Sequence, residues 1–196
     1  MNLLLDILPE SVDIDGKEYF VDTDFRTFII FEKVMDDAEV SAREKVHDLL
    51  SLCYTNEMPS NIEAALDRLL WLYSCGDIPQ SHRAKKNGDV IIKQPQIYDF
   101  QHDAPYIYGA FLSQYGIDLN DIEYLHWWKF QAMFRSLNSD NKIVEIMGYR
   151  AADLSKISNQ SERNRIAHLK RIYDLPNNLT FEDKVANAGA SFGGAF

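Results

Sequence analysis

The chain has 196 residues, of which 46% are hydrophobic and 26% charged, and its formal net charge is −10. This hydrophobic fraction excludes wholesale disorder, and the negative charge disfavours nucleic acids and anionic membranes as partners because repulsion opposes their approach. The 2 cysteines are too few for a disulfide scaffold, and no apolar stretch approaches the roughly 20 residues that span a membrane. We therefore expect a soluble, intracellular protein.

The chain opens with a predicted hairpin and a first helix. Residues 12–21 hold apolar and polar side chains around Asp15-Gly16, a pair typical of two-residue turns with positive φ angles. Thr23 or Asp24 can then cap a helix, because short polar side chains accept hydrogen bonds from the first free N–H groups. The apolar residues of this helix recur at helical spacing: Phe25, Phe28, Ile29 and Met35.

Two more helices follow, each with the same kind of start signal. Ser41 with Glu44, and Ser60 with Glu63, have the spacing of a capping box, in which each side chain bonds the other residue's N–H group. The predicted buried faces are Ala42, Val46, Leu49, Leu50 and Cys53 in the first helix, and Ile62, Leu66, Leu69, Leu70 and Tyr73 in the second.

The helical pattern stops over residues 76–97. Pro79, Asn87-Gly88 and Pro95 punctuate this stretch, and such residues mark turns and loops. The stretch therefore predicts an exposed excursion, with a second short hairpin around Asn87-Gly88.

Helical spacing resumes after Asp103. Pro105 is tolerated in the first turn of a helix, and Gly116 supplies a stop signal. The predicted inner face of this helix is Ile107, Tyr108, Phe111, Leu112 and Tyr115.

Two further helices are predicted in the last third of the chain. One covers Lys142–Met147 and ends at Gly148, and the other spans roughly Asn159–Tyr173. Residues 176–196 contain glycines and carry Phe192 and Phe196. This composition predicts a flexible tail with two aromatic side chains that could contact a partner.

The most unusual stretch surrounds Trp127-Trp128. The predicted helix begins at Asp118 or Asn120 and is apolar on almost every side. One face carries Leu125, Trp128, Ala132 and Met133. The opposite face carries Trp127, Phe130, Phe134 and Leu137. Adjacent helical residues diverge by about 100°, so we expect Trp127 and Trp128 to face different neighbours. One is predicted to lie in the core and the other to be available to a partner, because aromatic residues dominate interface hot spots.

The sequence gives only weak support for a metal site or a catalytic site. Glu44/His47 and Glu123/His126 share the E-x-x-H spacing of di-iron bundles, but Glu44 lies on the solvent side of its helix as a capping-box partner. His126, alone on an apolar stretch, is predicted to be a buried, hydrogen-bonded residue. Glycine-rich phosphate loops and the H-E-x-x-H motif are absent from the sequence. We therefore predict no catalytic, cofactor-binding or metal site.

One basic cluster lies on the last predicted helix. It consists of Arg163, Arg165, His168, Lys170 and Arg171. Such a cluster could touch phosphate, but a solvated face or an acidic partner agrees better with the overall negative charge.

Together these elements predict a mainly α fold. Residues 1–175 form a single helical domain with an N-terminal β-hairpin and the 76–97 excursion, and residues 176–196 form the flexible tail. The candidate partner-binding residues are Trp127, Trp128, Phe130, Phe134, Phe192 and Phe196.

Motifs in the second half of the chain resemble a known protein family. They are Tyr98-Asp-Phe100, Asp103, Tyr106-Ile-Tyr108, Phe111, Tyr115-Gly-Ile-Asp-Leu119, His126-Trp-Trp-Lys-Phe130, Ile146-Met-Gly-Tyr-Arg150 and Asp153-Leu-Ser155. The family is the one named for gene product fifteen of a siphophage of Gram-positive bacteria. The resemblance runs from the hairpin to about Pro176 and is most specific over residues 98–150.

The resemblance implies a role in phage biology. Such proteins are encoded in the tail-morphogenesis regions of phages and prophages and are similar to tail assembly chaperones, which hold the long tape measure protein soluble. We therefore expect the tape measure protein as partner, with the tail tube protein and self-association as further contacts. The expected location is the host bacterial cytoplasm and not the mature virion. The alternative is a structural tail or head–tail connector component.

Overall fold

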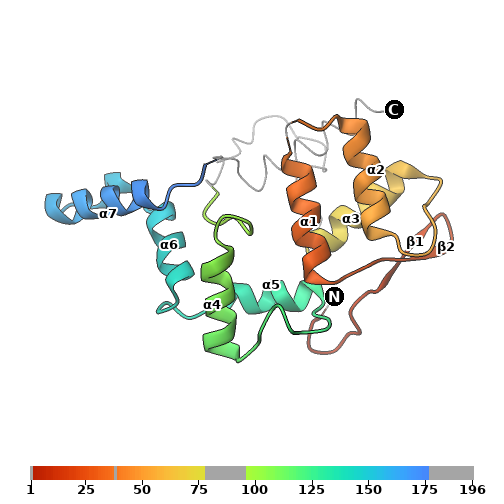
Figure 1. The fold of residues 1–196 in the computed structure, drawn as a ribbon, viewed down its shortest axis with the longest axis horizontal. Helices are drawn as coiled ribbons and strands as arrows, with labels where there is room; N and C mark the ends of the chain where they lie inside the picture. The colour runs from red at the N-terminus through yellow and green to blue at the C-terminus, as the bar shows by residue number, and fades with distance from the viewer. Residues whose placement is uncertain (1, 38, 78–95, 177–196) are drawn as a thin grey trace. The chain divides into compact units, whose positions relative to one another are not determined.

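The computed structural model describes residues 2–37, 39–77 and 96–176 (Figure 1). Within these ranges it contains seven α-helices, one short 3-10 helix and one two-stranded antiparallel sheet. The predicted mainly α fold with a short β-hairpin is confirmed. The predicted second hairpin at Asn87-Gly88 and the predicted tail with Phe192 and Phe196 lie outside the described residues.

Close contacts along the chain form two compact units. Of the described residues, the first unit comprises those up to 77 together with 123–132, and the second comprises 96–122 and 133–176. The boundary falls within α5 (Trp127–Arg135). Each unit has fully buried apolar side chains of its own, such as Phe28 in the first and Phe111 in the second.

The first unit begins with the predicted hairpin. Strands β1 (Ser11–Ile14) and β2 (Lys17–Phe20) pair antiparallel. The turn between them has positive φ angles at Asp15 and Gly16, 53° and 80°, as a two-residue turn that matches the strand twist requires. Val12, Ile14 and Tyr19 are buried.

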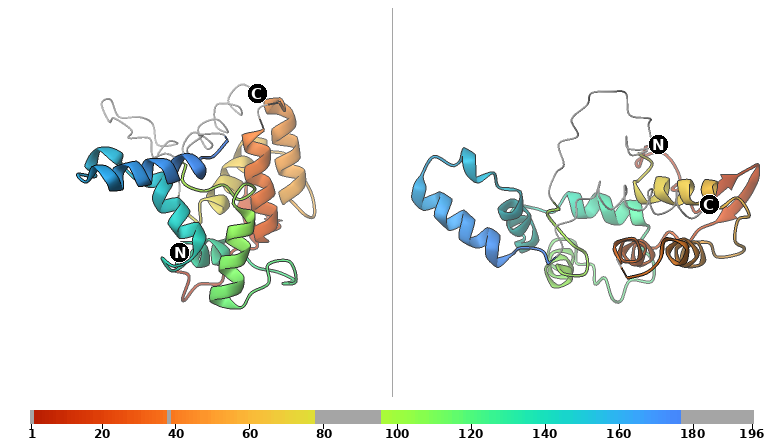
Figure 2. Two further views of the ribbon diagram at one scale, coloured as in Figure 1. Left: turned by 60° about the vertical axis from the view of Figure 1, so that its left-hand side comes forward. Right: turned by 90° about the horizontal axis from the view of Figure 1, so that it is seen from above.

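Three helices complete the N-terminal part of this unit: α1 (Phe25–Asp36), α2 (Ala42–Cys53) and α3 (Ile62–Tyr73). Asp24 caps α1 through the Arg26 N–H group, and the predicted capping box of Ser41 and Glu44 is confirmed at α2. Helix α1 packs on α2, α2 on α3, and α3 on β1 (Figures 1 and 2).

The start of α3 differs from the prediction by one residue. Asn61, rather than Ser60, is the cap, and its side chain accepts from the Ala64 N–H group. The Asn61 amide also donates to Asp15 in the hairpin turn at 2.8 Å. This second bond joins Asn61 to a residue 46 positions away in the sequence. It is the physical reason why the asparagine rather than the serine holds the cap position.

The second unit contains α4 (Ala104–Tyr115), α6 (Lys142–Ala151), the 3-10 helix η2 (Leu154–Lys156) and α7 (Gln160–Ile172). Helix α4 has Pro105 in its first turn and ends at Gly116, whose φ is 66°, as predicted. Helix α6 contacts both α4 and α7. The predicted end of α6 at Gly148 is wrong, because the helix continues to Ala151.

A buried ion pair explains why α6 continues past its glycine. Arg150 is 4% exposed and Asp103 is 0% exposed, and two bonds join the guanidinium to the carboxylate at 2.6 and 2.9 Å. The guanidinium also donates to the carbonyls of Ile97 and Tyr173, and the carboxylate accepts the Asp99 N–H group. One arginine therefore joins α6 to the segment before α4 and to the end of α7, which requires the last turn of α6 to form.

Replacing Arg150 with methionine should strongly destabilise the second unit. The change leaves the Asp103 carboxylate buried without its charge partner, which typically costs about 3–5 kcal/mol. The measurement is the free energy of unfolding from urea titration followed by far-ultraviolet circular dichroism. The matched control is Arg165→Met, which removes an exposed pair with Glu162 and should change the stability far less, because water screens exposed charges. Equal losses in the two variants would contradict a structural role for the buried pair.

Candidate functional site

The tryptophan-containing helix begins later than predicted. Helix α5 starts at Trp127, whereas the sequence predicted a start at Asp118 or Asn120. Its first helical hydrogen bond runs from the Phe130 N–H group to the His126 carbonyl at 3.0 Å. His126 is therefore the residue at which the chain turns into the helix.

Pairing with a remote segment holds the residues before α5 out of the helix. The Phe25 N–H group donates to the Leu125 carbonyl at 2.9 Å, and the Trp127 N–H group donates to the Thr23 carbonyl at 2.8 Å. The Leu125 N–H group also donates to the Asp24 carboxylate at 3.1 Å. These bonds use backbone groups that an earlier helical turn would need, so α5 cannot begin before Trp127.

Both tryptophans face the end of α3. The indole N–H group of Trp127 donates to the Tyr73 carbonyl at 2.8 Å, and that of Trp128 donates to the Leu72 carbonyl at 2.7 Å. The Trp127 ring stacks on Tyr73, and the Trp128 ring meets Trp71 edge-on. The two side chains are only 1% and 2% exposed.

The expectation that one of the two tryptophans is available to a partner is therefore wrong, because both side chains are buried, although their rings do contact different residues. Successive carbonyls in the last turn of a helix also diverge by about 100° and lack partners within the helix. Two adjacent indoles can consequently reach two adjacent carbonyls of one helix end. The divergence of the side chains on α5 matches the divergence of the acceptors on α3.

The other described candidates for partner binding are buried as well. Phe130 is fully buried and stacks on Phe25 with ring centroids 4.8 Å apart. Phe134, in the second unit, is buried against Tyr98 and Phe100. In this structure the four described candidates supply packing and not an exposed surface, while Phe192 and Phe196 lie outside the described residues.

His126 is a buried cap of α5. Its Nδ1 accepts the Trp128 N–H group at 3.0 Å, so the proton of the neutral ring lies on Nε2, which is 3.1 Å from the Pro9 carbonyl. Burial lowers the pKa of His126, and Lys129 acts in the same direction, while the Pro9 carbonyl and Glu10 act against it. The described residues include no group of three or more histidine, cysteine or acidic side chains that could hold a metal ion.

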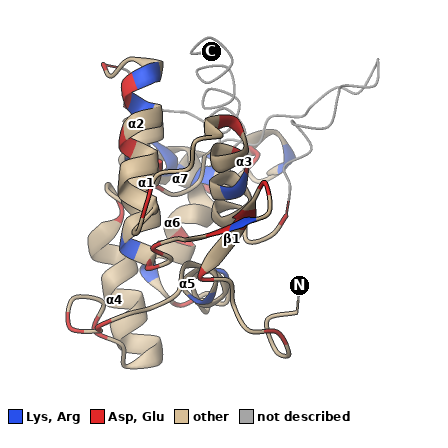
Figure 3. Cartoon of the chain, turned by 90° about the vertical axis from the view of Figure 1, so that its right-hand side faces the viewer, with Lys and Arg blue, Asp and Glu red and all other residues tan. Residues whose placement is uncertain are grey.

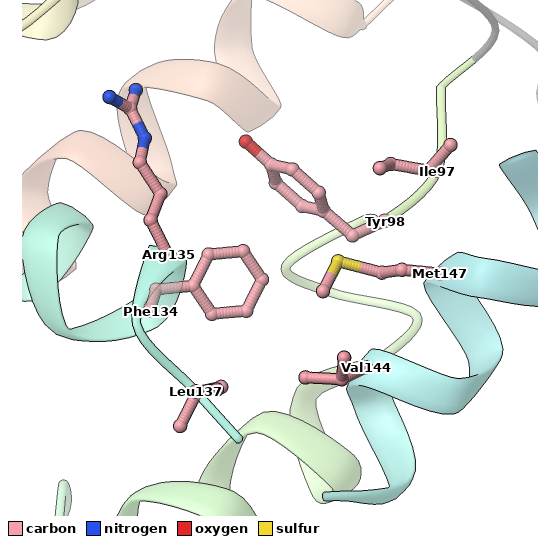
Figure 4. A pocket seen from close by; sticks show the side chains of 7 residues that line it. All are labelled: Ile97, Tyr98, Phe134, Arg135, Leu137, Val144 and Met147. Atoms are coloured by element: carbon pink, nitrogen blue, oxygen red, sulfur yellow. The ribbon is translucent and has the colours of Figure 1, made fainter. Parts of the chain in front are cut away.

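The second unit contains an open pocket of about 240 Å³ (Figure 4). Its lining is mostly apolar and consists of Ile97, Tyr98, Phe134, Arg135, Leu137, Val144 and Met147. Three parts of the chain contribute: the segment before α4, the end of α5 with the turn after it, and one face of α6, where the two lining residues are three apart. Such a pocket can take a bulky apolar side chain.

The rim of this pocket has a polar side. The Arg135 guanidinium and the Tyr98 hydroxyl lie on the same side of it in Figure 4. Arg135 is exposed, and within the described residues it makes no ion pair. The pocket therefore fits an apolar group with a carboxylate nearby, because an exposed guanidinium pairs readily with carboxylates.

Helix α4 presents a second apolar surface. It is the one α-helix of the described chain without a charged residue, and Figure 3 shows it tan along its length. Its outward residues include Tyr106 and Leu112, 38% and 45% exposed. The prediction that Leu112 lies on the inner face is therefore wrong, because Ile107, Ala110 and Phe111 form the buried stripe.

The basic cluster on α7 is partly engaged within its own unit. Arg165 pairs with Glu162, Arg163 donates to the Ile157 carbonyl, and Lys170 donates to the Ala152 carbonyl. These contacts agree with the interpretation of the cluster as a solvated helix face.

The family model described as Bacteriophage Gp15 protein matches residues 4–175. No curated protein and no solved structure matches the chain. The described residues hold no helix with the length and apolar character needed to span a bilayer.

Replacing His126 with asparagine should reduce the acid sensitivity of the fold. A histidine pKa that is lower in the folded state makes the unfolded state bind more protons, so stability falls as the pH drops below the ordinary value of 6.5. Asparagine can still accept the cap hydrogen bond but gains no proton. The measurement is the free energy of unfolding at pH 8 and pH 5.5 for each variant, and the exposed His168→Asn is the control. A pH dependence that survives in His126→Asn but not in His168→Asn would overturn this account.

Replacing Gly76 with alanine should destabilise the first unit. Gly76 has a φ of 85°, and an added Cβ would lie 3.2 Å from the Trp128 ring. The left-handed backbone alone costs about 1–2 kcal/mol for a residue with a Cβ. Gly148→Ala in α6 is the matched control, because an added Cβ there has nothing within 4 Å and should stabilise the helix by about 0.5–1 kcal/mol. Urea titration measures both changes, and a neutral Gly76→Ala would contradict the close packing of Trp128 on this turn.

Proposed function

This chain belongs to the Bacteriophage Gp15 protein family, and from that membership we propose that it is a tail assembly chaperone, which binds the tape measure protein during tail morphogenesis. The family suggests a structural or morphogenesis protein of a phage. The chaperone role is the more specific proposal.

The observation that carries the proposal is the uncharged outward face of α4. Exposed helix faces in soluble proteins are normally charged or polar, yet Tyr106, Gly109 and Leu112 lie along an exposed stripe of this helix. A tape measure protein is a long helical polypeptide with apolar stripes. An apolar helix face can cover such a stripe by helix-on-helix packing, which keeps the client from aggregating.

Gly109 adds to this argument. Glycine inside a helix typically costs about 0.5–1 kcal/mol relative to alanine, and nothing in the described chain lies within 4 Å of a Cβ added at this position. Packing within the described residues therefore does not require a glycine here. A client helix could approach the α4 backbone closely at this point, because small residues let two helices come near each other.

The proposed mechanism involves binding without catalysis. The buried ionisable side chains of the described residues that could carry chemistry, Glu32, Asp103, His126 and Arg150, are all engaged in hydrogen bonds that hold the fold. A short apolar stripe gives modest affinity per copy, so tube protein can displace the chaperone, while many copies along one client supply avidity. We propose that it acts in the host bacterial cytoplasm and is absent from the mature virion.

Co-expression with the tape measure protein of the same phage tests the proposal. The client should move from the insoluble to the soluble fraction and co-purify with this chain. Tyr106→Glu/Leu112→Glu should reduce the recovered client about tenfold, which corresponds to about 1.4 kcal/mol, because two carboxylates would face the apolar stripe of the client. No gain in client solubility with the unmodified chain would refute the chaperone role.

The control places a charge on a comparably exposed apolar residue elsewhere. Ile30→Glu, on α1 in the first unit, replaces a side chain that is 47% exposed and should leave client recovery unchanged. Mass spectrometry of purified virions provides an independent test. Stoichiometric presence of the chain in virions would favour the alternative, a structural tail or head–tail connector component.

A further inference from the structure

We propose that residues 2–8 of one copy of this chain, the leucine segment, dock into the pocket of the second unit of another copy. The contact joins two different surfaces of the same protein. It is separate from the α4 stripe, so it neither requires nor excludes the chaperone role.

The leucine segment exposes an apolar run that Asp6 alone interrupts. Leu4, Leu5 and Ile7 are 91%, 81% and 94% exposed, and Leu3 is 49% exposed. Soluble proteins expose single apolar side chains routinely, but contiguous apolar exposure marks an interaction site. The described residues of the chain provide no cover for this run.

The segment is also preorganised. The Asn2 carbonyl accepts the N–H groups of Leu5 and Asp6 at 3.0 and 2.8 Å, which closes one helical turn. The Asn2 side chain accepts the Leu4 N–H group at 2.9 Å, and the Asp6 carboxylate accepts the Asn2 N–H group at 2.6 Å. Because the turn is already formed, docking orders fewer groups than it would for a flexible peptide.

The base of the segment is anchored to the first unit. His126 binds the Pro9 carbonyl through Nε2 at 3.1 Å, and strand β1 begins two residues later, at Ser11. The chain is thus held from Pro9 onward, while the apolar side chains before it project outward. This arrangement presents the run at a fixed point on the protein surface.

The pocket of the second unit matches the segment in size and polarity. Its volume of about 240 Å³ exceeds that of cavities of about 150 Å³ that hold benzene, so a leucine side chain fits. Six of its seven lining residues are aliphatic, aromatic or thioether side chains, and the seventh is Arg135.

Charge complementarity selects the occupant. Asp6 lies between Leu5 and Ile7 in the segment, and Arg135 at the pocket rim makes no ion pair within the described residues. An apolar side chain in the pocket would bring the neighbouring carboxylate to the guanidinium, and such a bond is stronger than a neutral one. Both halves of the match belong to this chain, so the occupant is a second copy. A contact of this heterologous kind produces rings or open chains of subunits.

Complementation between two variants tests the proposal. Leu4→Ser/Leu5→Ser/Ile7→Ser removes the segment's apolar side chains but keeps the pocket, and Val144→Trp fills the pocket but keeps the segment. Sedimentation velocity should show concentration-dependent association of the unmodified chain. Each variant alone should be monomeric, and an equimolar mixture should give a heterodimer, because only one complete contact remains. Ile172→Ser, which changes an exposed apolar residue on α7, should associate like the unmodified chain.

Three results would overturn the proposal. They are a monomeric unmodified chain at all concentrations, association of the segment variant at the unmodified strength, and no heterodimer in the mixture. Docking of the segment into its own chain would give the first result. The ionic contact has its own measurement: Arg135→Glu should weaken association about tenfold, and the double variant Asp6→Arg/Arg135→Glu should restore it. Circular dichroism of every variant controls for folding.

Discussion

The first unit depends on two hydrogen bonds from adjacent indoles to adjacent carbonyls. The last carbonyls of α3 have no partner within their helix, and a buried carbonyl without a partner destabilises a fold. Trp127 supplies the donor for the Tyr73 carbonyl, and Trp128 adds a donor to the Leu72 carbonyl, which also accepts the Cys75 N–H group at 3.1 Å. The residues that each indole bond joins are 54 and 56 positions apart in the sequence. His126 caps the Trp128 N–H group, and the turn at Gly76 lies against the Trp128 ring, so both features border these two side chains.

Local signals in the sequence were sufficient for most of the fold. The Asp15-Gly16 turn, the Ser41/Glu44 capping box and the Gly116 stop each act within a few residues, and each is present in the structure. The misplaced boundaries have remote causes. Backbone pairing with Thr23 and Phe25 delays α5, and the bonds of Arg150 extend α6. No local pattern contains these partners.

The candidate surfaces were harder to foresee than the helices. Apolar periodicity does not distinguish a residue that faces the core from one that faces open solvent. The sequence therefore predicts that Leu112 lies on the inner face of its helix and that one of the two tryptophans faces outward. The pocket combines residues from three separate segments, and only the spacing of Val144 and Met147 on α6 was visible in the sequence. The family resemblance indicates a role in phage biology. The chemistry of the individual residues does not indicate that role.

All 3 tryptophans of the chain, Trp71, Trp127 and Trp128, belong to the first unit. Intrinsic tryptophan emission therefore comes from that unit alone, whereas backbone ellipticity reports on the helices of both. The edge-on approach of Trp71 and Trp128, with ring centroids 5.4 Å apart, also places two indole chromophores close enough to couple electronically. The native chain thus carries a spectroscopic label that can separate the melting of one unit from the melting of the other.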